Sequence, residues 1–363
     1  MQKCSMYNLV ILYLLSSLST EASNSLRSST PNMWIQLPNT QLKSIIEPSA
    51  YKQPISGFVG PKAIITAWNG AVWNEQEQRM DIIGAGGHAD YCGNEYNSFD
   101  LDDMRWYKIH GPSKLDGYDF TSGRTPDGRP ASRHTYQGQV YVESREKTYI
   151  FGGSLCSDAG TADNRRWSVT NDGQYEFLGG TSAWTTLGGH ALFDNQSGHI
   201  LLVKRGHVYQ YNIDKNTLID LTPKEADGRW GTSAALDTNR HRVLALGHGA
   251  AWIYDIDKNT KYKIDLHSRS TIKQTIGLGL VYIEKIDRYV AWAGGNSIMY
   301  IHPITFSIDI VLSKGVAPTS NPNGIYGRFR YSEKYNGFVV VSRYDEDVYF
   351  LPRGEQSIEN AVK

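Results

Sequence analysis

Cysteine is scarce in this sequence, and none of it has the spacing of a metal-binding motif. Only Cys4, Cys92 and Cys156 occur among 363 residues, and there is no CxxC pair. Structural zinc sites of the paired-cysteine types are therefore excluded. Cys92 and Cys156 form a candidate disulfide in an oxidising compartment, with two separate buried thiols as the alternative.

The chain also lacks an excess of charge of either sign. Its 37 Lys and Arg residues balance 37 Asp and Glu residues, so the net charge is zero. This balance argues against a nucleic-acid-binding protein with a large basic surface, although it leaves room for a local basic patch. General disorder is excluded by the 40% of apolar residues.

Long hydrophobic runs are missing as well. The most apolar stretch, residues 9–18, follows Lys3 and precedes a small polar stretch at residues 19–23. About ten apolar residues behind a basic one are too few to span a bilayer and are typical of a secretory signal. We expect residues 1–23 to be a signal peptide and the mature protein to be secreted or periplasmic, with a buried N-terminal segment as the alternative.

Glycine, tyrosine and tryptophan are abundant, at 35, 23 and 9 residues. This composition favours short strands and turns over long helices. The clearest internal repeat matches residues 211–217 to residues 254–260, which lie 43 positions further along the chain. In both copies alternating apolar residues run into a polar turn and out again, so each copy predicts a β-hairpin.

A second pattern, an apolar strand that usually ends on glycine, occurs six times, at residues 81–87, 149–153, 200–203, 242–247, 289–295 and 338–341. Each copy follows another apolar segment and a polar turn, and aromatic-rich strands come after it. Four antiparallel strands per unit of roughly 40 to 65 residues are typical of a propeller blade. We therefore predict an all-β, six-bladed propeller over residues 33–353, with residues 354–363 as a tail and seven blades as the alternative.

The last unit supplies only three strands before the chain ends. Residues 33–37 have the aromatic and apolar alternation of a fourth strand. We expect this N-terminal strand to join the last blade and close the ring, which removes an exposed sheet edge.

The longer connections are expected on one face of the ring, together with the loops between second and third strands. They cover residues 110–132, 179–188, 222–230, 267–275 and 313–326, whereas the first-to-second turns on the opposite face are short and polar. Binding and catalytic residues concentrate on long loops held by a rigid scaffold. The sequence therefore predicts the functional site on the face of the longer loops.

Basic, histidine and tyrosine side chains gather at that predicted face. The starts of first strands and the links before them contribute Arg133, His134, Tyr136, Trp184, His190, Arg229, Trp230, Tyr326, Arg328 and Arg330. The second-to-third loops contribute His88, Tyr91, Lys204 and His248. Few carboxylates accompany these residues, so the local excess of cations favours an anionic ligand. The same register places Cys92 and Cys156 in equivalent loops of adjacent blades, which favours a bridge between them.

These residues have structural alternatives. His134, His190 and His248 can each be hydrogen-bonded core histidines, and their equivalent positions can be a coincidence. A metal site is a further alternative, because His88 and these three histidines come from four blades and can converge on an axial ion such as zinc or iron, or a structural calcium. No other cofactor is indicated.

The first unit, with Gly86-Gly87, then Tyr96 and Trp106, resembles the kelch repeat of galactose-oxidase-like propellers. The copper-radical chemistry of galactose oxidase needs a tyrosine cross-linked to a cysteine. Neither Cys92 nor Cys156 has such a partner by sequence, so that chemistry is not expected.

The residues at the predicted face resemble those of secreted β-propeller polysaccharide lyases, particularly ulvan lyases, which usually have seven blades. The resemblance implies β-elimination on an anionic uronate-containing polysaccharide. Arg133, Arg328 or Arg330 would neutralise the carboxylate, and His134 or His88 would act as the base. Tyr136, or else Tyr91, would donate the proton, while the remaining cationic and aromatic residues at this face would bind the polymer.

Other functions are weighed against this one. A glycosidase normally needs two facing carboxyl groups, and no convincing pair lies at the predicted face. The main alternative is a non-catalytic kelch-type propeller that binds a glycan or a protein. In either case we expect a monomer that does not bind nucleic acid.

Overall fold

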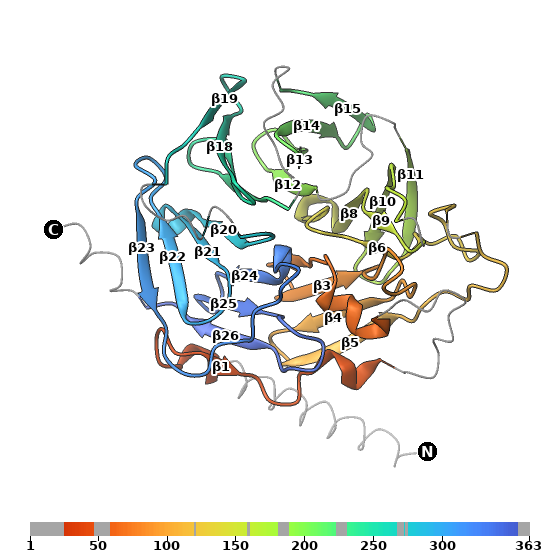
Figure 1. Cartoon of the computed structure of the whole chain (residues 1–363), viewed down its shortest axis with the longest axis horizontal. Helices are drawn as coiled ribbons and strands as arrows, with labels where there is room; N and C mark the ends of the chain where they lie inside the picture. Colours follow the sequence, from red (N-terminus) through yellow and green to blue (C-terminus); the bar gives the residue numbers. More distant parts are fainter. Residues whose placement is uncertain are drawn as a thin grey trace, which may run out of the picture.

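The computed structural model describes residues 25–46, 59–119, 121–157, 160–180, 189–222, 231–266, 272 and 275–354. These residues form six four-stranded antiparallel sheets, arranged like blades around a common axis, and one additional two-stranded sheet (Figure 1). The predicted all-β, six-bladed propeller is confirmed. The predicted signal peptide and residues 355–363 of the predicted tail lie outside the described residues.

The blades follow one another along the chain, each beginning with its innermost strand. Blade one has β2 (Val72–Asn74), β3 (Arg79–Ile83), β4 (Tyr96–Asp100) and β5 (Arg105–His110); blade two has β7 (Gln139–Val142), β8 (Lys147–Phe151), β10 (Arg165–Thr170) and β11 (Tyr175–Gly180); blade three has β12 (His190–Asp194), β13 (His199–Lys204), β14 (His207–Asn212) and β15 (Thr217–Asp220).

Blade four has β16 (Ser233–Asp237), β17 (Arg242–Gly247), β18 (Ala250–Asp255) and β19 (Thr260–Lys263); blade five has β20 (Gly279–Ile283), β21 (Arg288–Trp292), β22 (Ser297–Ile301) and β23 (Ile308–Leu312); blade six has β24 (Phe329–Ser332), β25 (Gly337–Val340), β26 (Tyr349–Pro352) and β1 (Ile35–Gln36). The short helical segments include η1 (Leu42–Ile45), η3 (Gly60–Lys62), α2 (Ala63–Thr66), η4 (Glu143–Arg145), η6 (Glu284–Ile286) and η7 (Tyr326–Arg328).

The hydrophobic pattern of each strand follows its distance from the axis. Inner strands lie between two neighbouring blades, so both of their faces are covered; β17 is buried along its whole length. Outer strands such as β15 and β19 are mostly exposed or half-buried. This difference explains why the continuous apolar runs in the sequence mark second strands.

The N-terminal strand completes the last blade, as its sequence predicts. β1 pairs antiparallel with β26, with Ile35 opposite Phe350 and Gln36 opposite Tyr349. The preceding residue, Trp34, packs its ring 5.8 Å from Trp292 and 6.3 Å from Tyr349. Residues from the two ends of the chain therefore share one sheet and one patch of core.

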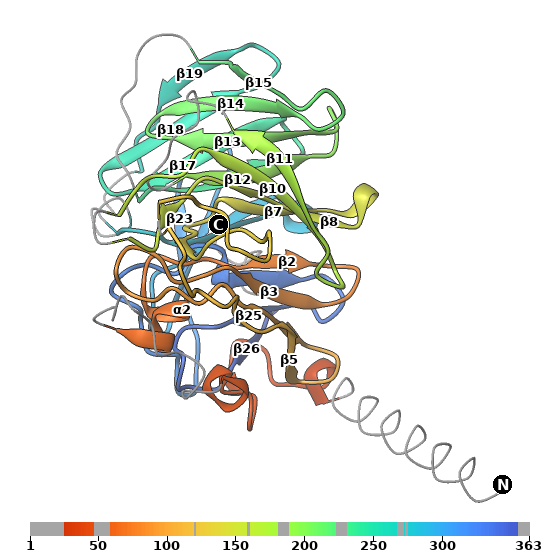
Figure 2. The same ribbon diagram turned by 90° about the vertical axis from the view of Figure 1, so that its right-hand side faces the viewer.

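The two faces of the ring differ in their connections. The short first-to-second turns project on one side, while α2 lies on the other (Figure 2). The second-to-third loops lie opposite the first-to-second turns, and the sheet formed by β6 (Arg133–His134) and β9 (Ser154–Leu155) includes part of the second-to-third loop of blade two. No described helix is long and apolar enough to cross a membrane.

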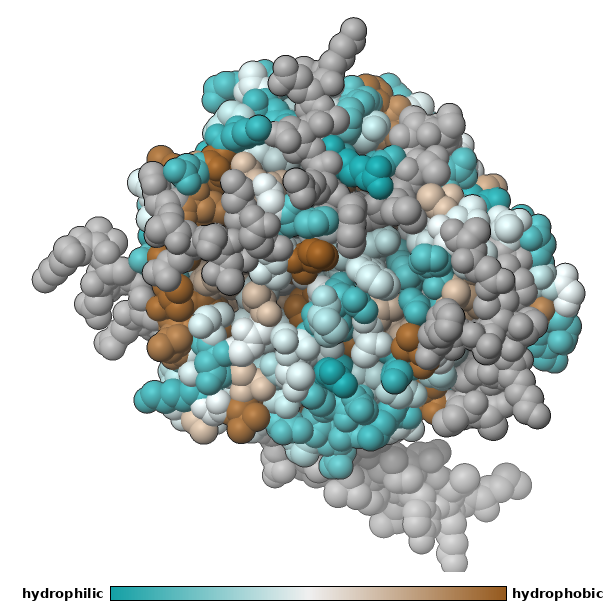
Figure 3. Space-filling view, in the orientation of Figure 1, coloured by the Kyte–Doolittle hydropathy of each residue, from teal (hydrophilic) through white to brown (hydrophobic). Residues whose placement is uncertain are grey.

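The outer edge of blade five is more hydrophobic than is usual for an edge strand. Ile310 and Leu312 of β23 are 39% and 69% exposed, and Val316 follows at 77%. Figure 3 shows hydrophobic surface along the left edge, where β23 lies in Figure 1. Since lysine or proline normally protects such edges, this one has little protection against pairing with another strand.

Replacing Trp292 tests how much the contact between blades five and six contributes to stability. Its ring is fully buried and lies 5.8 Å from both Trp34 and Phe329. We expect Trp292→Ala to lower the free energy of unfolding by about 3–5 kcal/mol in urea titrations, because the cavity cannot fully close. Ile304→Ala, at a side chain that is 62% exposed, should change it by less than about 0.5 kcal/mol; similar losses in both variants would contradict the assignment.

Candidate functional site

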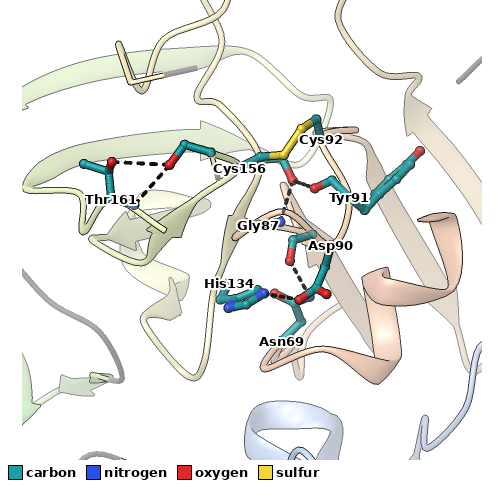
Figure 4. Close-up of a disulfide and its surroundings, with 11 residues drawn as sticks. Asn69, Gly87, Asp90, Tyr91, Cys92, His134, Cys156 and Thr161 are labelled. Atoms are coloured by element: carbon teal, nitrogen blue, oxygen red, sulfur yellow. Dashed lines mark hydrogen bonds and ion pairs between the residues drawn. A yellow bond between two sulfur atoms is a disulfide. The ribbon is translucent and has the colours of Figure 1, made fainter. Parts of the chain in front are cut away.

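A histidine and an aspartate from neighbouring blades meet on the face of the longer loops. His134 ends β6 above blade two, and Asp90 lies in the second-to-third loop of blade one. The Nε2 atom of His134 lies 2.8 Å from Oδ2 of Asp90 (Figure 4). The histidine is 1% exposed and the aspartate side chain 16% exposed. Because an aspartate oxygen accepts, Nε2 carries the proton and Nδ1 retains the lone pair.

A glycine allows the two loops to approach this closely. Gly87 has φ +79°, and a Cβ atom there would lie 2.1 Å from the backbone nitrogen of His134. Its N–H donates to Tyr91 O at 2.8 Å and lies 3.1 Å from Ser132 Oγ. Any other residue would push Asp90 away from His134.

A disulfide fastens the same two loops, and so the predicted Cys92–Cys156 bridge is confirmed. Its Cα atoms lie 5.2 Å apart across a sequence separation of 64 residues. Cys92 follows Asp90 by two positions, and Cys156 follows β9, the strand that pairs with His134 (Figure 4). The bridge therefore holds the loop of Asp90 against the strand of His134.

Aromatic rings surround the imidazole of His134. Trp68 lies 5.2 Å away between ring centroids, His88 lies 5.8 Å away and Tyr136 6.2 Å away. Tyr326 continues the row, 5.6 Å from Tyr136. His88 is exposed, whereas the two tyrosines are buried. The resulting aromatic cluster joins blades one, two and six.

Several residues here have a left-handed backbone that their side chains disfavour. The φ angles are 27° for His88, 48° for Tyr136 and 49° for Tyr326. None of these lies in the short first-to-second turns, where asparagine and other turn residues adopt positive φ. Such conformations cost on the order of 1–3 kcal/mol each and concentrate at functional sites. Their clustering supports a functional interpretation of this face.

Burial keeps the imidazole of His134 neutral and the phenol of Tyr136 protonated. It lowers the pKa of His134, which Asp90 only partly opposes, so the imidazole is neutral at pH 7. Burial raises the pKa of Tyr136 to about 12, with Arg205 acting in the opposite direction, so the phenol keeps its proton. The pair can accept and donate a proton, respectively.

The accessible positive charge beside this cluster comes from blade three. Arg205 is exposed and lies near enough to Tyr136 to influence its pKa. Lys204, half-buried beside it, has a lowered pKa because of burial and the repulsion of Arg205. Two adjacent cations at the second-to-third loop suit an anionic ligand.

Two predicted ligand-binding arginines are instead buried in the protein framework. Arg133 is 1% exposed; its Nη1 donates to Asp163 Oδ2 at 2.6 Å and to Gly152 O at 2.9 Å. Arg328 is fully buried and donates to four backbone carbonyls, those of Asn69, Val341, Ser342 and Gly324. Their guanidinium groups hold loops together, and their hydrogen bonds are made within the protein.

His190 and Arg330 lie deeper, at the axis of the ring. His190 is 1% exposed, and its Nδ1 lies 3.3 Å from Gln137 Oε1. Burial lowers its pKa to about 4, with the Thr232 backbone acting against this shift and Arg330 adding to it. Arg330 lines a separate central cavity.

The remaining predicted site residues are spread more widely. Tyr91 points away from His134 and donates its hydroxyl to Glu95 (Figure 4). His248 belongs to the corresponding loop of blade four, next to Gly231. Trp184, Arg229 and Trp230 lie outside the described residues.

The expected first strand of blade two starts later than the sequence suggests. Arg133 and His134 pair with Leu155 and Ser154 in the separate two-stranded sheet, and the first strand begins at Gln139. His134 and Tyr136 therefore do not lie on one strand. The left-handed turn at Tyr136 still brings the two rings together.

The four histidines do not share a metal site. All four are described, yet no group of three or more His, Cys, Asp or Glu side chains in the described ranges could hold a metal ion. His88 lies beside His134, whereas His190 and His248 belong to other parts of the ring. The alternative of a metal site shared by these histidines is therefore not supported among the described residues.

Three contributors to the site were not assigned a role from the sequence: Trp68, Asp90 and Arg205. Trp68-Asn69-Gly70 has the same aromatic-polar-glycine order as Tyr136-Gln137-Gly138. This shared pattern before two first strands was a usable signal for Trp68. Asp90 and Arg205 carry no such pattern, because their partners come from neighbouring blades.

Comparison with known proteins supports the fold alone. No family model matches the sequence, and no curated protein matches it. Among solved structures, the chain is similar to YjhT, at 10% identity and a TM-score of 0.55, covering 82% of this chain and 98% of that one. It is also similar to an auxiliary nutrient binding protein from Bacteroides thetaiotaomicron, at 10% identity and a TM-score of 0.50, covering 79% and 69% of the two chains.

The buried histidines should make stability depend on pH. The pKa of His190 is 6.5 in the unfolded chain and about 4 in the folded chain. At pH values between these two, the unfolded chain binds a proton at His190 that the folded chain does not. The contribution of neutral His190 to the free energy of unfolding is therefore complete above pH 6.5. It decreases as the pH falls and is smaller by about 2 kcal/mol at pH 5. Guanidinium unfolding at pH 7 and pH 5 should show a smaller loss in His190→Gln; equal losses in both proteins would contradict this.

Removing the disulfide should loosen the two loops and destabilise the chain. The double variant Cys92→Ser/Cys156→Ser should lose about 2–5 kcal/mol of unfolding free energy, since the bridge closes a long loop. Wild-type protein treated with a reductant should show the same loss in urea titrations. An unchanged transition midpoint in either sample would show that the bridge does not hold this face.

Proposed function

We propose that this protein is a secreted polysaccharide lyase that cleaves an anionic, uronate-containing polysaccharide by β-elimination. The observation that carries the proposal is the neutral imidazole of His134, oriented by Asp90, beside the protonated phenol of Tyr136. Elimination needs a base, a proton donor and a cation that holds the carboxylate. All three kinds of group occur at this face.

His134 would take the proton from C5 of the uronate through Nδ1, because Nε2 is bonded to Asp90. The electron pair forms the C4–C5 double bond, and the bond from C4 to the glycosidic oxygen breaks. Tyr136 would give its proton to that oxygen. The products are one chain that ends in an unsaturated uronate and one chain with a new reducing end.

Arg205 and Lys204 are the best placed groups to neutralise the uronate carboxylate. Arg205 is exposed and close to Tyr136, whereas Arg133 and Arg328 are already bonded within the protein. A guanidinium next to the carboxylate lowers the pKa of the C5 proton by stabilising the charge that develops there. His88, exposed beside His134, would contact the polymer or share the role of base.

The predicted signal peptide and the disulfide support a protein of an oxidising, extracytoplasmic compartment. The second candidate function is binding of the polymer without cleavage. The 1% exposure of His134 favours that candidate, because a base must reach the substrate. A binding-only site would hold the same anionic polymer through Arg205 and Lys204.

The test is incubation of the full chain with a panel of uronate-containing polysaccharides, followed by ultraviolet absorbance of unsaturated uronates and by reducing ends. We expect His134→Gln and Tyr136→Phe to lower the rate by about 10²–10⁴-fold. Arg205→Gln should mainly raise KM. His199→Gln, on the opposite face of the ring, is the matched control and should retain full activity.

Full activity of His134→Gln would exclude that residue as the base. Retention of polymer by the wild-type protein, with neither new absorbance nor new reducing ends, would establish the binding function in place of the lyase.

A further inference from the structure

A cavity separate from the His134 site lies on the axis of the propeller, towards the face of the first-to-second turns. It has a volume of about 510 Å³ and is lined by residues of all six blades, from their innermost strands or the residues that flank them. None of Asp90, His134 or Tyr136 lines it. This volume falls within the usual range for small-molecule sites.

The mouth of this cavity is acidic. The residue directly after the first strand is a glutamate in four blades, at Glu75, Glu143, Glu284 and Glu333. Three of them, Glu75, Glu143 and Glu333, line the cavity. Burial and the other glutamates raise the pKa of Glu333. Within the described residues none of the four forms an ion pair, so the mouth would attract a positive group.

The inner end of the cavity carries the opposite charge. Arg330 lines it and, within the described residues, donates only to backbone oxygens, from Nε to Gly327 O at 2.9 Å and from Nη2 to Ala71 O at 3.3 Å. Burial lowers its pKa to about 10, so it is still charged at pH 7. The buried His190 lies near enough for Arg330 to help lower its pKa.

Arg330 is half-buried. A cation partly removed from water without an ion pair is costly, and three of the buried arginines avoid this cost. Arg133 and Arg242 pair with Asp163 and Asp237, respectively, and Arg328 donates to four backbone carbonyls. Arg330 has neither arrangement among the described residues. A ligand anion at this position would compensate its charge.

The inner edges of the sheets provide a third feature. The first strand of every blade, from β2 to β24, is an edge strand of its sheet. Its outward-facing backbone groups can therefore bond to an extended chain that enters the axis. Leu192, Leu280 and Tyr141 among the lining residues offer apolar contacts.

We propose that the axial cavity binds the end of a short peptide, with the C-terminal carboxylate at Arg330 and a positively charged group at the glutamate mouth. Glu333 lies three positions after Arg330 along an extended strand, so their Cα atoms are about 10 Å apart. An extended tripeptide spans about the same length. The acidic mouth disfavours the anionic polysaccharide proposed for the other face, so the two sites take different ligands.

Calorimetric titration of the full chain with lysylglycylglycine and with its C-terminal amide tests the proposal. The free acid should bind at least about tenfold more tightly than the amide, because only the acid compensates Arg330. Arg330→Gln should abolish this preference. If that variant does not fold, the comparison of acid and amide on the wild-type protein still decides the matter.

Glu143→Gln, at the mouth, should weaken binding of the tripeptide about threefold or more. Glu146→Gln, in the same turn but outside the cavity, is the matched control and should leave affinity unchanged. Equal affinity for acid and amide, or no binding of the acid at up to about 10 mM, would overturn the proposal. Both variants leave the His134 face intact, so lyase or polymer-binding assays on them separate failure here from failure of the proposed function.

Discussion

The contact between Asp90 and His134 is the constraint on which the proposed chemistry depends. Two loops from different blades would not bring these side chains to 2.8 Å by themselves. Gly87 permits the close approach, the disulfide prevents the loops from separating, and β6 and β9 fix the strand that carries the histidine. A neutral imidazole with a defined tautomer is the result, and it lies beside a tyrosine that keeps its proton.

The two faces of the ring carry local charge of opposite sign, although the whole chain is neutral. Arg205 and Lys204 stand beside the aromatic cluster on the face of the longer loops, while glutamates surround the axial cavity on the other. The glutamates follow the first strands of four blades, so one residue choice repeated around the axis is multiplied at a single opening, whereas Arg205 and Lys204 are neighbours in one loop of blade three. A net charge of zero is therefore compatible with two surfaces of opposite charge.

The sequence predicts the architecture well because blades are local. Six apolar strands and the N-terminal segment at Trp34 identify the ring, and the equivalent loops of Cys92 and Cys156 identify the bridge. The site is predicted less well, because partners come from distant segments. Arg133 looks like an exposed cation until Asp163 is placed beside it. The glutamates after the first strands look like ordinary solvated turn residues until the ring brings them together.

The most direct test of the central claim is a nitrogen NMR measurement of the His134 imidazole, with and without short oligouronates. The account predicts a neutral ring at pH 7, protonated on Nε2 towards Asp90, whose Nδ1 signal shifts on addition of oligouronate and stays unchanged with a neutral oligosaccharide. A ring protonated on Nδ1 alone, or a signal insensitive to oligouronates at saturating concentration, would contradict it.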